Sequence, residues 1–147
     1  MMRTTFDSSD QRLAYALLRM VVGLNLMMHG VSRMLAGTDK FAAHMVGQFT
    51  HSPLPGWSVW DFGMVLPAME ALLGLLLLIG LRTRAALVAG SLLIMVLTFG
   101  SALAQDWPAA ATQLNYALVY SALLFLLRYN GWSLDACMVR DETTQAS

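Results

Sequence analysis

The feature that most constrains the fold of this chain is a series of long apolar stretches, each close to the length of a membrane-spanning helix. A helix needs about 20 mainly apolar residues to cross the ~30 Å hydrocarbon core of a bilayer. Four such stretches occur, at residues 13–35, 62–81, 85–104 and 109–127. Because unpaired backbone polar groups are not tolerated in lipid, each stretch is expected to be an α-helix.

The composition excludes most soluble classes of protein. Of the 147 residues, 57% are hydrophobic and 12% are charged, whereas an average soluble domain is about 25% charged. Nine basic and nine acidic residues cancel, so the chain has no positive field of the kind that holds nucleic acid. The single cysteine, Cys137, excludes an internal disulfide and a CxxC motif. We therefore predict one all-α domain over residues 1–147, a four-helix bundle in the lipid bilayer.

Basic residues near the ends of the spans predict the orientation of the bundle. With both ends of the chain inside (N-in, C-in), the inner side carries Arg3, Arg12, Arg82, Arg84, Arg128 and Arg140, and the outer side carries Arg33 and Lys40. This distribution satisfies the positive-inside rule. Residues 36–61 then form a longer outer loop, and residues 128–147 form a cytoplasmic tail.

The outer loop contains a short amphipathic pattern. Phe41, Met45 and Phe49 recur every four residues, which places them on one face of a helix. Such a helix can lie flat on the outer leaflet or cap the bundle. Two prolines and a glycine within residues 53–56 are expected to end it.

Ionisable residues inside the spans point to a candidate site, because a central Arg or Asp costs about 2.5–3.5 kcal/mol on insertion scales. Arg19, His29 and Arg33 share one face of the first span, flanked by Asn25. Glu70 is the acidic residue midway through the second span. The small residues expected to support close helix packing are Gly23, Gly30, Gly63, Pro67 and Gly74. We predict that the two faces meet and bring Arg19, His29 and Glu70 near the bundle centre.

Glu70 has two predicted partners. Counted from the inner ends of their spans, Arg19 lies about 9 Å and Glu70 about 16 Å into the membrane. An extended arginine can cover this offset. His29 lies nearer the outer side and can approach Glu70 from above. Glu70 can therefore pair with Arg19, accept a hydrogen bond from His29, or carry a proton and be neutral.

Two interpretations of these polar residues stay open. In the first, Arg19 and Glu70 form a structural ion pair that sets the register of the helices. In the second, the polar residues form a proton or hydrogen-bond site for a small redox carrier. A quinone, for example, needs a donor at each carbonyl and a route for protons. Gln113, Tyr116 and Tyr120 lie on one face of the fourth span and offer further hydrogen-bonding groups.

No haem, metal or flavin site is expected on this chain. His29 is the one histidine inside a span, whereas bis-histidine haem needs two that face each other. His44 and His51 in the outer loop lack an acidic or thiol partner that would complete a metal site. The chain is therefore not expected to transfer electrons by itself.

Three groups of residues form an ordered set of motifs along the chain. The first span carries Arg19, Gly23, His29, Gly30 and Arg33, the second carries Pro67, Glu70 and Gly74 followed by Gly80, Leu81, Thr83 and Arg84, and the segment after the last span carries Gly131, Ser133, Leu134 and Asp135. This set resembles the DoxX family of small membrane proteins, with an arginine at position 33 where that family usually has lysine.

The resemblance implies a multi-pass protein of the bacterial inner (cytoplasmic) membrane. One branch, DoxD, looks like a subunit of thiosulfate:quinone oxidoreductase, so the resemblance implies quinone as the cofactor and a protein partner in a membrane redox complex. The favoured function is a membrane subunit of a quinone-linked, respiratory-type complex, which anchors a partner and lines a quinone or proton site. The alternatives are an assembly subunit without chemistry of its own and a small-molecule or ion carrier acting as a homo-oligomer.

Overall fold

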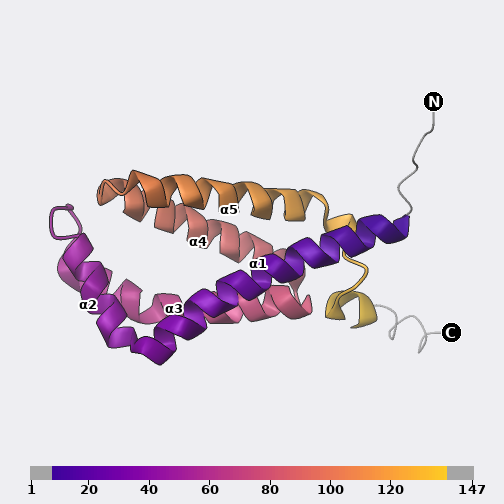
Figure 1. Cartoon of the computed structure of the whole chain (residues 1–147), viewed down its shortest axis with the longest axis horizontal. Coiled ribbons are helices and arrows are strands. Elements are labelled where there is room, and N and C mark those ends of the chain that lie inside the picture. The colour runs from indigo at the N-terminus through magenta and orange to yellow at the C-terminus, as the bar shows by residue number, and fades with distance from the viewer. Residues whose placement is uncertain (1–7, 139–147) are drawn as a thin grey trace.

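The computed structural model describes residues 8–138, and these form an assembly of helices (Figure 1). The elements are α1 (Ser8–Ala36), α2 (Thr38–Gln48), α3 (Gly56–Ile79), α4 (Thr83–Leu103), α5 (Trp107–Phe125) and the 3₁₀ turn η1 (Leu127–Tyr129). No strand occurs in this part of the chain, so the all-α expectation is confirmed. Arg3 and Arg140, which entered the orientation argument, lie outside the described residues.

Three helices are long and apolar enough to cross a membrane. These are α1, α3 and α4, with 29, 24 and 21 residues, and they make the chain a multi-pass membrane protein. α5 has 19 residues but is more polar, because Gln113, Asn115 and Tyr116 lie within it. The start of α1 lies at the same end of the molecule as η1 (Figure 1). This arrangement is the one expected of a chain that crosses the membrane an even number of times. The fourth span and the N-in, C-in orientation stay predictions.

The helices form two antiparallel pairs, α1 with α3 and α4 with α5 (Figure 1). A tight turn at residues 80–82 joins the pairs at one end. Gly80 ends α3 in the left-handed region, with φ 72°, and its N–H donates to the Leu76 carbonyl at 3.0 Å. Glycine suits this position because it has no Cβ to clash. The two pairs are therefore held together where α3 turns into α4.

Small residues set the close approach of α1 to α3. A Cβ at Gly23 would lie 2.5 Å from the backbone nitrogen of Leu78, and a Cβ at Gly30 would overlap the Pro67 carbonyl. A Cβ at Gly74 would overlap the backbone of Met27. These contacts put two helix backbones in direct van der Waals contact, as in small-residue membrane helix pairs. They also fix which residues of α1 and α3 face each other.

The segment between the first two predicted spans is more ordered than a loop. α2 forms the short helix expected there, although it ends at Gln48 and Phe49 caps it. α2 packs against α3, with Phe41 and Met45 beside the buried Leu66. The pattern of apolar residues on one face therefore caps the bundle.

α3 begins at Gly56, earlier than the predicted residue 62. Pro55 stands at its N-cap with φ −68°, a value that suits the start of a helix. Gly63 was expected at the contact between α1 and α3, but a Cβ there would lie 3.0 Å from Ala42 of α2. The extra turns at the start of α3 therefore pack against α2, and Gly63 allows close approach between α3 and α2 rather than between α3 and α1.

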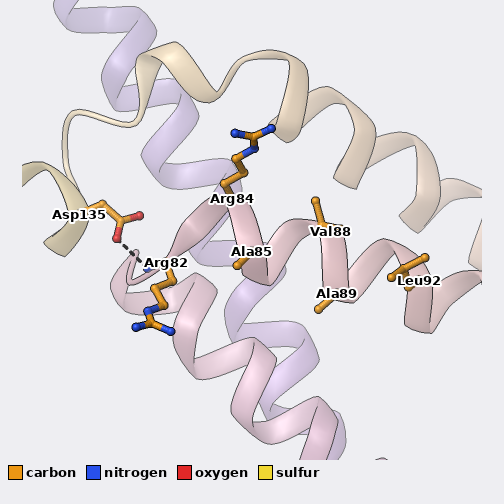
Figure 2. Close-up of a pocket in the computed structure, with 7 residues that line it drawn as sticks. All are labelled: Arg82, Arg84, Ala85, Val88, Ala89, Leu92 and Asp135. Atoms are coloured by element: carbon orange, nitrogen blue, oxygen red, sulfur yellow. Dashed lines mark hydrogen bonds between the residues drawn. The ribbon is translucent and has the colours of Figure 1, made fainter.

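The first part of the predicted tail packs back on the bundle. The Asp135 carboxylate accepts the backbone N–H groups of Arg82 at 2.6 Å and Thr83 at 2.8 Å (Figure 2). The Asp135 N–H donates to the Gly80 carbonyl at 3.0 Å. A residue distant in sequence therefore caps the start of α4, a role that usually falls to the residue just before the helix.

Candidate functional site

The candidate site is built around an ion pair between α1 and α3. Nη1 of Arg33 lies 2.6 Å from Oε1 and 2.5 Å from Oε2 of Glu70. Glu70 is 3% exposed, while the Arg33 side chain is 29% exposed. The guanidinium also stacks on the ring of Phe41 in α2, 4.5 Å from the ring centroid. No other salt bridge forms among residues 8–138.

The predicted pair of Arg19 with Glu70 is wrong. Arg19 lies at the other end of α1, where it donates to the carbonyls of Leu77, Leu78 and Trp132, the last two at 3.2 and 2.8 Å. The reason is the register of the two antiparallel helices. Gly30 packs against Pro67, which brings the end of α1 to Glu70 and leaves Arg19 beside the end of α3.

A polar cavity of about 310 Å³ lies beside the ion pair, between the two helix pairs. Six of the seven predicted site residues line it: Asn25, His29, Arg33, Glu70, Tyr116 and Tyr120. Its size is within the range of about 300–1,000 Å³ typical of small-molecule sites. The structure therefore brings together every predicted site residue except Arg19.

Hydrogen bonds orient two of the polar groups in this cavity. The Tyr116 hydroxyl of α5 donates to Oδ1 of Asn25 in α1 at 3.2 Å. Nδ1 of His29 lies 2.9 Å from the Asn25 carbonyl. Because a carbonyl can only accept, Nδ1 carries the proton in this bond, and Nε2 is left to exchange a proton with a ligand or water.

A second, more apolar cavity of about 430 Å³ adjoins the first, on the side of α2. Its apolar walls come from α2, α3, α4 and the α2–α3 connection, and they include Phe41, Met45, Phe49, Phe62, Leu66 and Phe99. Arg33, Glu70 and Gln113 line both cavities. The ion pair therefore stands at the boundary between a cavity richer in polar side chains and a cavity richer in aromatic side chains.

Gln113 lines both cavities, although the sequence pattern indicated it only as a further hydrogen-bonding group. Its Nε2 donates to the Ser101 hydroxyl at 2.9 Å, and its Oε1 is buried without a hydrogen-bond partner in the described part of the chain. An unsatisfied buried oxygen is costly unless a ligand or water donates to it. The spacing of Gln113 with Tyr116 and Tyr120 was the available signal, whereas nothing indicated that Phe41 stacks on Arg33.

The arrangement can bind, orient and exchange protons with a small polar ring. The carboxylate, imidazole, two phenols and amide supply hydrogen-bond donors and acceptors at one end, and aromatic and aliphatic side chains supply an apolar surface at the other. Within residues 8–138, no three His, Cys, Asp or Glu side chains lie together as metal ligands would. Hydrogen-bonding groups are therefore what this site offers to a ligand.

Comparison with known proteins adds the family. A family model described as "Methylamine utilisation protein MauE" matches residues 11–113 of the chain, well over half of it. The chain belongs to the MauE family. The match covers α1 to α4 and the start of α5, including both Arg33 and Glu70. No curated protein and no solved structure matches the chain.

Membership of the MauE family makes the predicted DoxX assignment wrong. The motifs that suggested it consist of small residues and isolated charges at helical spacing. Gly23, Gly30 and Gly74 are needed here for close contact between two helix backbones, and that need arises wherever membrane helices pack tightly. Such motifs report helix packing and do not separate one membrane family from another.

Proposed function

We propose that this MauE-family protein is a membrane accessory subunit of the redox system for methylamine utilisation, in the bacterial cytoplasmic membrane. In this proposal the polar cavity takes the ring of a quinone, and a protein partner carries the electron-transfer centres. The observation that supports it most is the Arg33–Glu70 pair at the boundary of a polar and an apolar cavity.

The polar cavity suits the ring of a quinone. Arg33 uses Nη1 on Glu70, so its other N–H groups can donate to a ring carbonyl. Tyr116 is a second donor once its hydroxyl leaves Asn25. Glu70 and Nε2 of His29 are groups that can hold a proton beside the ring. The unpartnered Oε1 of Gln113 fits a hydroxyl donor on the reduced form.

The apolar cavity suits the tail of the same ligand. Phe41, Phe62 and Phe99 are among the side chains that line it, and it shares Glu70 with the polar cavity. A quinone supplies the redox couple when bound, and this chain positions the ring, shields it from water and holds protons. An isoprenoid tail in the bilayer is already out of water, so contact with these walls contributes van der Waals packing and not hydrophobic transfer energy.

Titration of the full chain in lipid nanodiscs with a short-chain ubiquinone tests this proposal. We expect saturable binding that Glu70→Gln weakens by at least tenfold, about 1.4 kcal/mol. Asp61→Asn is the matched control, because Asp61 is an exposed carboxylate on the same helix that lines neither cavity. Absence of saturable binding, or equal affinities for the two variants, would contradict the quinone site.

A structural role without chemistry is the second candidate. It is supported by the position of the ion pair, which links α1 to α3 beside the Gly30 contact. If the pair only holds the helices together, Arg33→Leu combined with Glu70→Leu should be tolerated better than either change alone, because both charges disappear. Normal methylamine-dependent respiration in the double variant would favour this candidate over the quinone site.

A further inference from the structure

A third cavity, of about 610 Å³, lies at the other end of the molecule, beside the turn between α3 and α4 (Figure 2). We call it the turn cavity. Arg82 and Arg84 line it at the turn, and Ala85, Val88, Ala89 and Leu92 continue it along α4. Figure 2 shows the two guanidinium groups on opposite sides of the start of α4, with the apolar side chains spaced along the helix. The cavity therefore combines a cationic end with an apolar strip.

The two arginines of the turn cavity lack a carboxylate partner in the part of the chain that the structure describes, where the one salt bridge joins Arg33 to Glu70. Asp135 is the acidic residue that lines the cavity, but both of its carboxylate oxygens accept backbone N–H groups of the turn. The cavity has a net positive charge, since two guanidinium groups face one carboxylate. An anion is the complementary ligand.

The backbone at Arg82 gives an independent reason to assign its side chain a role. Arg82 has φ 47°, in the left-handed region where glycine is the favoured residue. Gly80, two residues earlier, adopts the same region at φ 72°. An arginine at such a position is strained, and strained backbone recurs at ligand sites. The Arg82 guanidinium is exposed at the turn cavity, so ligand binding by this group would explain why arginine occupies a strained position.

We propose that the turn cavity binds one anionic phospholipid. The phosphate lies over the start of α4, where the exposed side chains of Arg82 and Arg84 can turn toward it from the two sides of the helix, and an acyl chain follows the strip from Ala85 to Leu92. Val88 and Leu92 are 42% and 55% exposed, so a chain can cover them. In the predicted N-in orientation this end faces the cytoplasmic leaflet, whose anionic lipids are attracted to basic residues at helix ends. The site is independent of the quinone site and lies at the opposite end of the bundle.

Native mass spectrometry of the full chain, released from micelles with added lipid, tests this proposal. We expect the protein to retain phosphatidylglycerol about thirtyfold more than phosphatidylcholine of the same acyl chains, as two arginine contacts of about 1 kcal/mol each imply. Arg84→Gln should lower this preference to about fivefold. Arg128→Gln is the matched control, because Arg128 is exposed near the same end but does not line the turn cavity. Equal retention of the two lipids by the wild-type chain would overturn the proposal.

Two further variants separate lipid binding from folding and from simple anion binding. Arg82→Gly suits the left-handed backbone, so it should keep the fold and still lower the preference for phosphatidylglycerol to about fivefold. Ala89→Trp fills the apolar strip without changing charge, and it should also lower retention. Glycerol 1-phosphate in excess should not displace the lipid. Full displacement by glycerol 1-phosphate, or full retention in Ala89→Trp, would show that the acyl chain is not bound and would overturn the lipid assignment.

Discussion

The buried Arg19 and the partly buried Arg33 of α1 lie at opposite ends of the α1–α3 pair, and their charges are satisfied in different ways. Arg19 is 2% exposed and donates to backbone carbonyls at the end of α3 and after α5. Arg33 pairs with a side chain, stacks on Phe41 and borders two cavities. Arg19 is therefore enclosed by protein atoms, whereas Arg33 borders cavities that a ligand can occupy.

This difference predicts a structural role for Arg19 and a role in ligand binding for Arg33. The carbonyls at the end of a helix lack intrahelical partners, so the guanidinium of Arg19, whose Nη1 donates to Leu77 and Leu78, completes the end of α3. The Glu70 carboxylate is held by one cation at the edge of a cavity, where it can be repartnered. Variants at the first arginine should therefore change stability, and variants around the second should change binding.

Arg19→Leu should give the largest loss of stability. Three carbonyls lose their donor, and a buried unsatisfied polar group costs about 1–3 kcal/mol. The free energy of unfolding, measured by denaturant titration in micelles, should fall by about 3 kcal/mol or more. Arg128→Leu removes an exposed arginine near the same end, together with its stacking on Tyr129 at 4.8 Å from the ring centroid, and should lower it by no more than about 1 kcal/mol. Similar losses in both variants would contradict a clamp at Arg19.

Gly74→Ala should give the next largest effect, because it acts on the contact that holds the two arginines in register. The added Cβ would overlap the backbone of Met27, and overpacking of this kind costs about 1–3 kcal/mol. Gly47→Ala in α2 is the control, since a Cβ there meets nothing within 4 Å. That change should stabilise the helix by up to about 1 kcal/mol. Denaturant titration should show a loss for Gly74→Ala and a smaller gain for Gly47→Ala, and a gain for both would contradict the close contact at Gly74.

Arg33→Lys tests whether geometry matters more than charge at the candidate site. A lysine keeps the charge next to Glu70 but loses the guanidinium plane that stacks on Phe41. We expect a loss of about 1 kcal/mol in stability, the size of a partly exposed cation–π contact. Quinone affinity should fall further than stability does. Unchanged affinity in Arg33→Lys would show that the guanidinium does not contact the ligand.

The sequence was enough to predict the helices and the cluster of polar residues, because both follow from composition and helical periodicity. The first, third and fourth apolar stretches correspond to helices within a few residues of the predicted ends. Asn25, His29 and Arg33 recur on one face of α1, and that face does line the polar cavity. The periodicity of a helix depends only on residues near each other in the sequence, so the face on which a residue lies can be predicted without knowing how the helices pack.

The partner of Glu70 could not be predicted, because it depends on how two helices are aligned. Arg19 and Arg33 are separated by close to four helical turns and lie on the same face of α1, so periodicity does not distinguish them. The depth argument assumed that both spans begin at the membrane surface. α1 in fact begins at Ser8, before the predicted residue 13, and glycine contacts set the alignment. The register of α1 against α3 depends on the contacts between the two helices and cannot be read from either helix alone.

Tyr116→Phe should have the smallest effect on stability and still report on the cavity. The change removes one hydrogen bond, from the Tyr116 hydroxyl to Asn25, whose donor–acceptor distance of 3.2 Å is at the long end of the range. The free energy of unfolding should change by less than about 0.5 kcal/mol. If the hydroxyl donates to a bound quinone, affinity in the nanodisc titration should nevertheless fall by a few-fold, within the ~1 kcal/mol net value of one hydrogen bond. Tyr129→Phe, in η1 and outside both cavities, should leave affinity unchanged. The same small loss in both variants would remove Tyr116 from the ligand contacts and leave Arg33 and Glu70 to carry the site.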